Sequence, residues 1–513
     1  MAEPDEPLGP PAPVDATRPH LISRRRLLQG LGALAGAGLA SSVVGCSPFS
    51  PASPDGSSGR TDGEGYRSRP DLRPPSIVID THRPGTDPGL VITECHAGTG
   101  QQGPMIVGDR DLVWFKPVSD HGTASLRAFN VRVQPYRGAP VLCWFEGAVV
   151  DGHGSGHYVI ADSSYRQVAT VEGGNGLTGD LHELFLTEAG TAVFTAYGTA
   201  TADLSAYGGS RKGAYFYGEV QEVDVATGRL VYSWRSDTHV GFAESYAPAP
   251  GNGSNPWDYF HINSIDVDPS DGNLIVSSRN CWAFYKVDRR TGALVWRLGG
   301  KRSDFSMATG THFAYQHDVT PQGGGVYTIF DNEGSPWVDP PSRGLALHVD
   351  EGARRVSLVR QYLHSPPVRS GALGSVQDLP AGHVFIGWGQ DPYFTEYDAS
   401  GRVLFDGHLV GSGLVSYRAF KQAWTGRPSA PPDIAVERSG ASTVIYVSWN
   451  GATEVARWRV LAGSSSSRLA QFGTYARAGF ETRITLSTHP RQVALEALDA
   501  SGRVLGRSRA HPA

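Results

Sequence analysis

The sequence contains little cysteine, little charge of either sign and no excess of positive charge. Charged residues make up 19% of the 513 positions, and 45 Lys and Arg stand against 50 Asp and Glu, giving a net charge of −5. Electrostatically driven binding to nucleic acid needs a basic face, so this balance argues against that class of protein. The sequence also lacks a GxxxxGK[ST] loop and therefore a phosphate cradle of the P-loop type.

The four cysteines are Cys46, Cys95, Cys143 and Cys281. Their spacing does not match that of a zinc site, and we expect neither a bound metal nor a cofactor. The N-terminus has the features of an export signal, described below. Export of the chain would bring the last three cysteines into an oxidising compartment. A Cys95–Cys143 disulfide is then one option, and free thiols are the other.

Glycine and proline are abundant instead. The chain has 64 Gly and 35 Pro, about a fifth of all residues. This density argues against a helical bundle and favours an all-β protein with many short strands joined by turns. A 40% hydrophobic content over this length allows a large core and more than one domain.

Residues 1–45 have the features of an export signal. Arg24-Arg25-Arg26 precedes an apolar stretch from Leu27 to Val44, and the paired arginines resemble the twin-arginine type. The stretch ends at Cys46 in a lipobox-like sequence, which predicts lipidation of this cysteine; a transmembrane anchor with an incidental cysteine is the alternative. Residues 46–72 predict a flexible tether. We therefore expect an extracytoplasmic protein, lipid-anchored to the outer face of the cell membrane.

The body of the chain repeats a strand, a turn that begins with Asp, and an alternating strand. The intervals between the copies are 48 to 64 residues, and the aspartates are Asp109, Asp162, Asp224, Asp288, Asp350 and Asp398. Aspartate at such turns usually caps nearby backbone N–H groups, so we assign it no catalytic role. Six copies of about 60 residues predict a six-bladed β-propeller over residues 73–425, closed by an N-terminal strand that joins the blade containing Asp398.

A proline-rich boundary at residues 427–432 separates the propeller from the C-terminal segment. Residues 432–513 alternate polar and apolar positions, with Trp449 and Trp458 in expected strands. This pattern is similar to that of an immunoglobulin or fibronectin type III β-sandwich, which predicts a separate small domain.

Polar residues recur at similar places in successive repeats. His182, His261, His317 and Gln377 each precede a glycine-containing turn and an apolar strand. If these strands are innermost in their blades, the four side chains converge on the propeller axis; they then form either a site or a structural layer of hydrogen bonds.

Arg279 ends the hairpin that His261 begins and can either form a buried ion pair or clamp an anion such as a sulfate group. Arg343 is a weaker candidate of the same kind. Asn263 and Gln377, with Arg343, are candidate substrate-binding residues.

The stretches WDYFHINSIDVD, SSRNCWAFYKVDRRTGALVWRLGG and QHDVTPQGGGVYTIFDNEG make the chain resemble the bacterial six-bladed members of the arylsulfotransferase family over roughly residues 75–420. The resemblance implies an enzyme in which a histidine takes a sulfonyl group from an aryl sulfate ester and passes it to a phenol, without a nucleotide sulfate donor. It implies that His317 becomes sulfated, that His261 and Arg279 bind the sulfonyl oxygens, and that His182 completes the site.

The chain departs from the family pattern at three points. Gln377 stands at the fourth position and cannot carry protons, and both the lipid anchor and the C-terminal sandwich differ from the well-known members. A second hypothesis is a non-catalytic, lipid-anchored propeller that binds an anionic or glycan ligand in its channel. A quinone- or metal-dependent oxidoreductase is less favoured, because the histidines lack a companion carboxylate or cysteine set with clear metal spacing. The expected partners are aryl sulfates, phenols and the membrane, and no nucleic acid.

Overall fold

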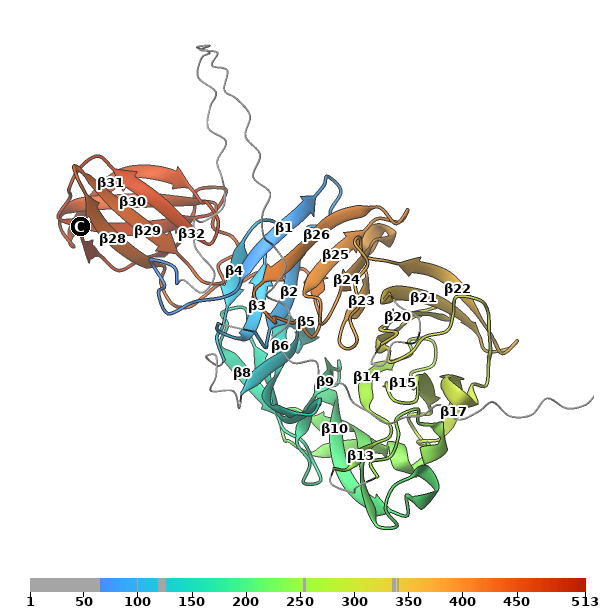
Figure 1. The fold of residues 1–513 in the computed structure, drawn as a ribbon. Helices are drawn as coiled ribbons and strands as arrows, with labels where there is room; N and C mark the ends of the chain where they lie inside the picture. Colours follow the sequence, from blue (N-terminus) through green and yellow to red (C-terminus); the bar gives the residue numbers. More distant parts are fainter. Residues whose placement is uncertain (1–64, 99, 119–125, 252–254, 335–337, 339–340) are drawn as a thin grey trace, which may run out of the picture. The chain divides into compact units, whose positions relative to one another are not determined.

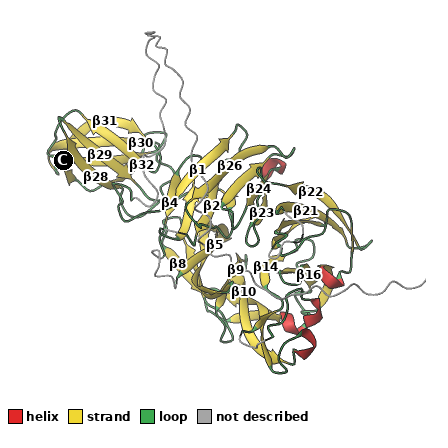
Figure 2. Cartoon of the chain, in the orientation of Figure 1, coloured by secondary structure: helices red, strands yellow, loops and turns green. Residues whose placement is uncertain are grey.

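The computed structural model describes residues 65–98, 100–118, 126–251, 255–334, 338 and 341–513. The predicted export signal, Cys46 and most of the tether lie outside these residues. Regular structure in the described part consists of β-strands and short 3₁₀ helices (Figure 1, Figure 2), which confirms the all-β prediction. No helix in this part has the length and hydropathy needed to cross a membrane. The 3₁₀ helices are η1 (Ser205–Tyr207), η2 (Ser236–Thr238), η3 (Phe242–Glu244), η4 (Gly300–Arg302) and η5 (Pro380–Gly382).

The described strands up to residue 422 form five antiparallel-rich sheets. One sheet contains β2 (Leu90–Cys95), β3 (Gly103–Val107), β4 (Leu112–Phe115) and β27 (Phe420–Gln422). A nine-stranded sheet contains β5 (Arg127–Tyr136), β6 (Ala139–Val150), β7 (His153–Ala161), β8 (Gln167–Val171), β9 (Gly179–Leu186), β10 (Thr191–Ala202), β11 (Gly213–Asp224), β12 (Leu230–Arg235) and β13 (Trp257–Asp258).

The other three of these sheets follow in chain order. They contain β14 (Ile262–Val267), β15 (Leu274–Ser278), β16 (Ala283–Val287) and β17 (Leu294–Gly299); then β18 (Ser306–Met307), β19 (His317–Gly323), β20 (Val326–Asp331), β21 (Arg343–Asp350) and β22 (Arg355–Tyr362); and finally β1 (Ser76–His82), β23 (Ser375–Asp378), β24 (Val384–Gly387), β25 (Tyr393–Tyr397) and β26 (Val403–Val410).

The predicted aspartate turns connect strands in these sheets. The Asp224 carboxylate accepts a hydrogen bond from the Thr227 backbone N–H at 2.8 Å, and Asp288 makes the equivalent bond at 2.7 Å. The Asp398 carboxylate accepts one from the Ser400 N–H at 2.9 Å. These side chains replace backbone partners that a tight turn lacks, which confirms their structural role.

The inner strands form a closed ring of neighbours. β5, β9, β14, β19, β23 and β27 contact one another in that order, and β27 contacts β5. Two strand pairings between residues far apart in the sequence close the ring. β1 pairs with β26, which confirms that an N-terminal strand joins the sheet next to Asp398. β27, from the far end of this region, pairs with β2 and supplies an inner strand that the sequence did not predict.

A buried ionic cluster joins the strands of this ring. The fully buried Arg418 guanidinium lies 2.8 Å from a Glu183 oxygen of β9 and 3.2 Å from an Asp318 oxygen of β19. It also donates a hydrogen bond to the Asn263 carbonyl of β14 at 3.2 Å. Arg132 of β5 donates to the other Glu183 oxygen. Four inner strands are therefore tied to the segment that leads into β27.

The C-terminal segment consists of two sheets that share an apolar core. They contain β28 (Asp433–Ser439), β29 (Ser442–Ser448) and β32 (Glu481–Leu486), and β30 (Arg457–Ser465), β31 (Arg468–Ala476), β33 (Gln492–Leu498), β34 (Val504–Arg507) and β35 (His511–Pro512). Ile445 of the first sheet and Trp458 of the second belong to one buried cluster. Trp458 lies in a strand as predicted, whereas Trp449 follows the end of β29.

Cys95, Cys143 and Cys281 are buried and have free thiols, so the Cys95–Cys143 disulfide is not formed. Burial raises the pKa of each thiol to about 12, which keeps the three side chains protonated and unreactive.

We predict that Arg418→Met lowers the free energy of unfolding by about 3–5 kcal/mol, because Glu183 and Asp318 would remain buried without their cation. Urea denaturation monitored by tryptophan fluorescence measures this loss. The matched control is Arg402→Ala, which removes an exposed guanidinium paired with Asp398 and should leave the curve unchanged. Equal effects of the two substitutions would contradict the role given to the cluster.

Candidate functional site

A cavity of about 330 Å³ lies at the ends of the inner strands and brings together the three predicted histidines and Arg279. His182, His261 and His317 are at most 8% exposed. Other polar residues on its wall are His96, Arg127, Asp151 and Asp258. Side chains from β9, from β19, from the residue after β15 and from the loop before β14 line the cavity, so three of the four residues expected to converge meet there and Gln377 does not.

His317, the first residue of β19, has a fixed tautomer. Its Nδ1 lies 2.7 Å from the Asn332 side-chain oxygen, while the Asn332 amide nitrogen donates to the Ser370 and Leu373 carbonyls. Because the amide nitrogen donates to those carbonyls, the Asn332 oxygen accepts a hydrogen bond from the Nδ1–H of His317. Burial and the nearby Arg279 charge lower the His317 pKa well below its usual value. The neutral ring therefore has an unprotonated Nε2 at the cavity wall, which accepts a hydrogen bond from the Leu373 N–H at 3.3 Å.

His261 is held in a strained backbone conformation beside a carboxylate. Its φ angle of 52° lies in the left-handed region, which a non-glycine residue adopts at a cost of about 1–3 kcal/mol. Its Nδ1 donates to the Asp258 carboxylate at 2.5 Å, so Nε2 is the nitrogen left for the cavity. Burial lowers the His261 pKa to about 4 against the opposing effect of Asp258, with His182 and Arg279 adding to the decrease.

His182 in β9 has the same type of partner. Its Nδ1 lies 2.6 Å from the Asp180 carboxylate, which also accepts hydrogen bonds from the Gly154 N–H and the Thr195 hydroxyl. The His182 and His261 rings meet edge to face, with centroids 4.9 Å apart. Two carboxylate-supported histidines thus lie next to each other on one side of the cavity.

Arg279 is one of two arginines on the cavity wall, together with Arg127. It follows β15, lies over the Tyr315 ring at 4.7 Å and donates to the Asn280 side-chain oxygen at 3.0 Å. Within the described residues, no carboxylate lies within ion-pair distance of its guanidinium. Burial lowers its pKa, although arginine remains charged at any physiological pH. An unbalanced cation in a partly dry cavity is suited to bind an anion.

Three predicted substrate-binding residues lie away from the cavity wall. Gln377 bonds through its amide to the backbone of Lys421 in β27 at 2.7 and 3.1 Å. It lies in β23 and does not line the cavity with the three histidines to which the sequence made it equivalent. Asn263 donates to the Gln316 carbonyl, and Arg343 pairs with Asp331 at 2.9 Å. All three have structural partners.

The sequence analysis missed the acidic partners of the histidines. Asp180 precedes His182 by two residues and Asp258 precedes His261 by three, a recurrence that a search upstream of each histidine would have found. His153 was also missed. Its Nε2 lies 3.2 Å from the Asp258 oxygen that His261 contacts, and the ligand-type atoms of the three residues lie within 4.8 Å of one another. The 2.5 Å contact between His261 and Asp258 is a hydrogen bond, and the 3.2 Å contact between His153 and Asp258 is an ion pair when His153 is protonated.

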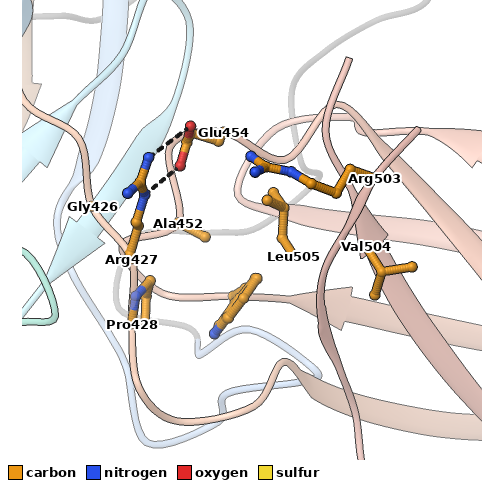
Figure 3. Close-up of a pocket in the computed structure, with 9 residues that line it drawn as sticks. Gly426, Arg427, Pro428, Ala452, Glu454, Arg503, Val504 and Leu505 are labelled. Atoms are coloured by element: carbon orange, nitrogen blue, oxygen red, sulfur yellow. Dashed lines mark hydrogen bonds and ion pairs between the residues drawn. The ribbon is translucent and has the colours of Figure 1, made fainter. Parts of the chain in front are cut away.

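A second cavity, of about 320 Å³, lies against the C-terminal segment (Figure 3). Arg427 at its rim makes a two-point contact with Glu454 at 2.7 and 3.2 Å. Arg503 pairs with Asp499 at 3.0 Å. Because these charges already have partners, this cavity lacks the free polar groups of the histidine site.

Comparison with known proteins gives one informative match. A family model described as Arylsulfotransferase (ASST) matches residues 132–409, more than half of the chain. No curated protein matches.

Solved structures show only remote similarity. A protein of unknown function from Bacteroides caccae is 12% identical, covering 65% of this chain and 98% of that one, with a TM-score of 0.40. The β-propeller domain of Cps50 (Swd1) from Myceliophteria thermophila is 12% identical, covering 64% and 97%, with a TM-score of 0.31. A streptogramin B lyase is 10% identical, covering 72% and 94%, with a TM-score of 0.33. Scores below 0.5 support no argument about this chain.

We predict that inorganic sulfate binds in the histidine cavity and that Arg279→Gln weakens this binding at least about tenfold, because a charge-assisted hydrogen bond is lost. Isothermal titration calorimetry with sodium sulfate measures the change. Arg343→Gln is the control, since that arginine is outside the cavity and should leave the affinity unchanged. Equal affinities of the wild type and the Arg279 variant would contradict the assignment.

Proposed function

Because the chain belongs to the arylsulfotransferase family, we propose that it transfers a sulfonyl group from an aryl sulfate ester to a phenolic acceptor through a sulfated His317. The observation that carries this proposal is the unprotonated Nε2 of His317, held by Asn332, in one cavity with the unpaired charge of Arg279. A nucleophile and an anion-binding cation are the two groups that transfer of a sulfonyl group needs.

In the first half-reaction, His317 Nε2 forms a bond to the sulfur of the donor while the bond from sulfur to the aryl oxygen breaks. The electron pair of that bond leaves with the aryl oxygen. A proton from Nε2 of the protonated form of His261 converts the phenolate to a phenol. Asp258 supports this step, because a carboxylate at Nδ1 stabilises the imidazolium that donates the proton.

In the second half-reaction, the acceptor phenol gives its proton to His261 while its oxygen bonds to sulfur. The bond between sulfur and His317 breaks, and its electron pair returns to Nε2. Arg279 binds the sulfonyl oxygens in both steps, and His182 completes the site beside His261. In this proposal the cycle consumes no nucleotide sulfate and needs no cofactor.

We also propose the finer architecture and location expected from the sequence. The closed ring of inner strands supports a six-bladed β-propeller over residues 73–425, and the shared core of the last two sheets supports a β-sandwich over residues 432–513. Lipidation at Cys46, with residues 46–72 as a tether, would hold the enzyme at the outer face of the cell membrane, where its partners would be aryl sulfates and phenols.

The alternative is a non-catalytic propeller that binds an anionic or glycan ligand in the same cavity. Both functions use Arg279, so anion binding alone does not distinguish them. Only the enzyme requires an unprotonated nucleophilic nitrogen and a proton-carrying neighbour.

We predict that the protein releases 4-nitrophenol from 4-nitrophenyl sulfate and that His317→Ala reduces this rate by at least about a thousandfold, because the nucleophile is lost. Mass spectrometry of a quenched reaction should find one SO₃ group on His317. His157→Gln, a change on β7 outside the cavity, is the control and should keep the rate. A wild-type protein with neither turnover nor adduct would favour the binding protein.

A further inference from the structure

A tight turn between β6 and β7 places His153 next to the site, outside the cavity wall. Asp151 and Gly152 connect β6 to β7 with φ angles of 48° and 83°, and Val150 pairs with His153 across the turn. Two central residues with positive φ are typical of a type I′ hairpin, for which Asp-Gly is a favoured sequence. The turn fixes the position of His153, and a Cβ at Gly152 would lie 3.5 Å from the His261 ring.

The His153 ring is locked in place by packing. It stacks on Phe216 with centroids 4.4 Å apart and meets Tyr197 edge-on at 4.5 Å. Its side chain is 12% exposed, and it does not belong to the cavity wall. Substrate would therefore touch His261, while His153 stays one residue behind it.

One carboxylate oxygen serves both rings. Asp258 Oδ2 accepts a hydrogen bond from His261 Nδ1 at 2.5 Å and lies 3.2 Å from His153 Nε2, an ion-pair distance when His153 is protonated. Among the described residues, His153 Nε2 and the buried Asp258 Oδ1 have no hydrogen-bond partner, so His153 acts on Asp258 through its charge. A positive charge on His153 reduces the negative charge of Asp258 that is available to His261. The two histidines therefore compete for Asp258.

We propose that His153 is a positioning residue for His261: by sharing Asp258, it sets how tightly His261 holds the proton that it exchanges with the phenol. This inference rests on the proton-transfer role of His261 in the proposed function. His153 keeps Asp258 ionised and weakens its hold on His261, so that His261 can release its proton to the leaving group.

The electrostatics of the group agree with this geometry. Burial acts to lower the His153 pKa, but the neighbouring Asp258 carboxylate raises it, with contributions from Asp180 and the Val150 backbone. The Asp258 pKa is held low by His261 and His153 although burial acts to raise it. The titratable and charged groups around His261 are Asp258, His153, His182, His317, Arg279 and Tyr197.

Substitutions of His153 and of Asp258 should shift the His261 pKa in opposite directions. His153→Phe keeps the ring packing but leaves Asp258 to His261 alone, so the imidazolium of His261 is stabilised and its pKa rises. Asp258→Asn removes the negative charge, so the same pKa falls. Acceptor turnover needs neutral His261 as a base, and the acidic limb of kcat/KM for the acceptor should move up by about one pH unit in the first variant and down in the second.

The experiment is a pH profile of 4-nitrophenyl sulfate turnover with a phenol acceptor, together with an NMR titration of ¹⁵N-labelled histidines in the full chain. The His261 signal is assigned by its loss in His261→Gln. His153→Gln, which keeps a hydrogen-bond donor but no titrating charge, should reproduce the upward shift even if the phenylalanine variant folds poorly. His157→Gln is the matched control on the same strand and should leave the titration unchanged.

Shifts of opposite sign in the His153 and Asp258 variants support the proposal. An unchanged His261 titration in both His153 variants, with only a lower rate, would overturn it and leave His153 a packing residue. If the wild type shows no turnover, the proposed function fails, whereas the NMR titration still decides how the carboxylate is shared.

Discussion

The pairing of one buried arginine with two buried carboxylates is the constraint on which the site depends. Arg418 contacts Glu183 and Asp318, and each of these residues directly follows a histidine of the cavity, His182 and His317. Successive side chains of a strand point to opposite sides. In both pairs the carboxylate contacts Arg418 and the preceding histidine lines the cavity, although at Asp318 a φ of 53° interrupts the regular strand. The ionic cluster therefore fixes the register of the strands and the direction of the histidines together.

This role explains why charges are buried where apolar residues would pack as well. A buried ion pair is weak evidence for stability, because desolvation offsets much of its attraction. Its value lies in specificity: a slip of one residue would bring His317 rather than Asp318 to Arg418 and leave a cation unpaired. Arg418 also lies just before β27, the strand that closes the ring. The same segment of the chain therefore closes the ring and holds the strands that carry the histidines.

The site residues that recur at similar places in successive repeats could be predicted from the sequence. The prediction failed where irregular strand pairing interrupts the repeat. His182, His261, His317 and Arg279 follow a common pattern and share a cavity. Register shifts in β14 and β19, next to His261 and His317, break the one-to-one correspondence between repeats. The repeat pattern therefore led to Gln377, whose amide bonds to the Lys421 backbone outside the cavity. The closure by β27 and the Arg418 cluster join residues that are far apart in the chain. No local sequence pattern predicts such contacts.

The three histidines of the cavity differ in what each Nδ1 contacts. The Nδ1 atoms of His182 and His261 lie against the carboxylates of Asp180 and Asp258. His317 Nδ1 donates to the neutral amide of Asn332, which fixes its tautomer without adding negative charge. In the proposed reaction, a carboxylate at that place would favour protonation of Nε2 and would remove the lone pair that is to attack sulfur. The difference between the proposed nucleophile and the two neighbouring histidines therefore originates at Asn332, Asp180 and Asp258.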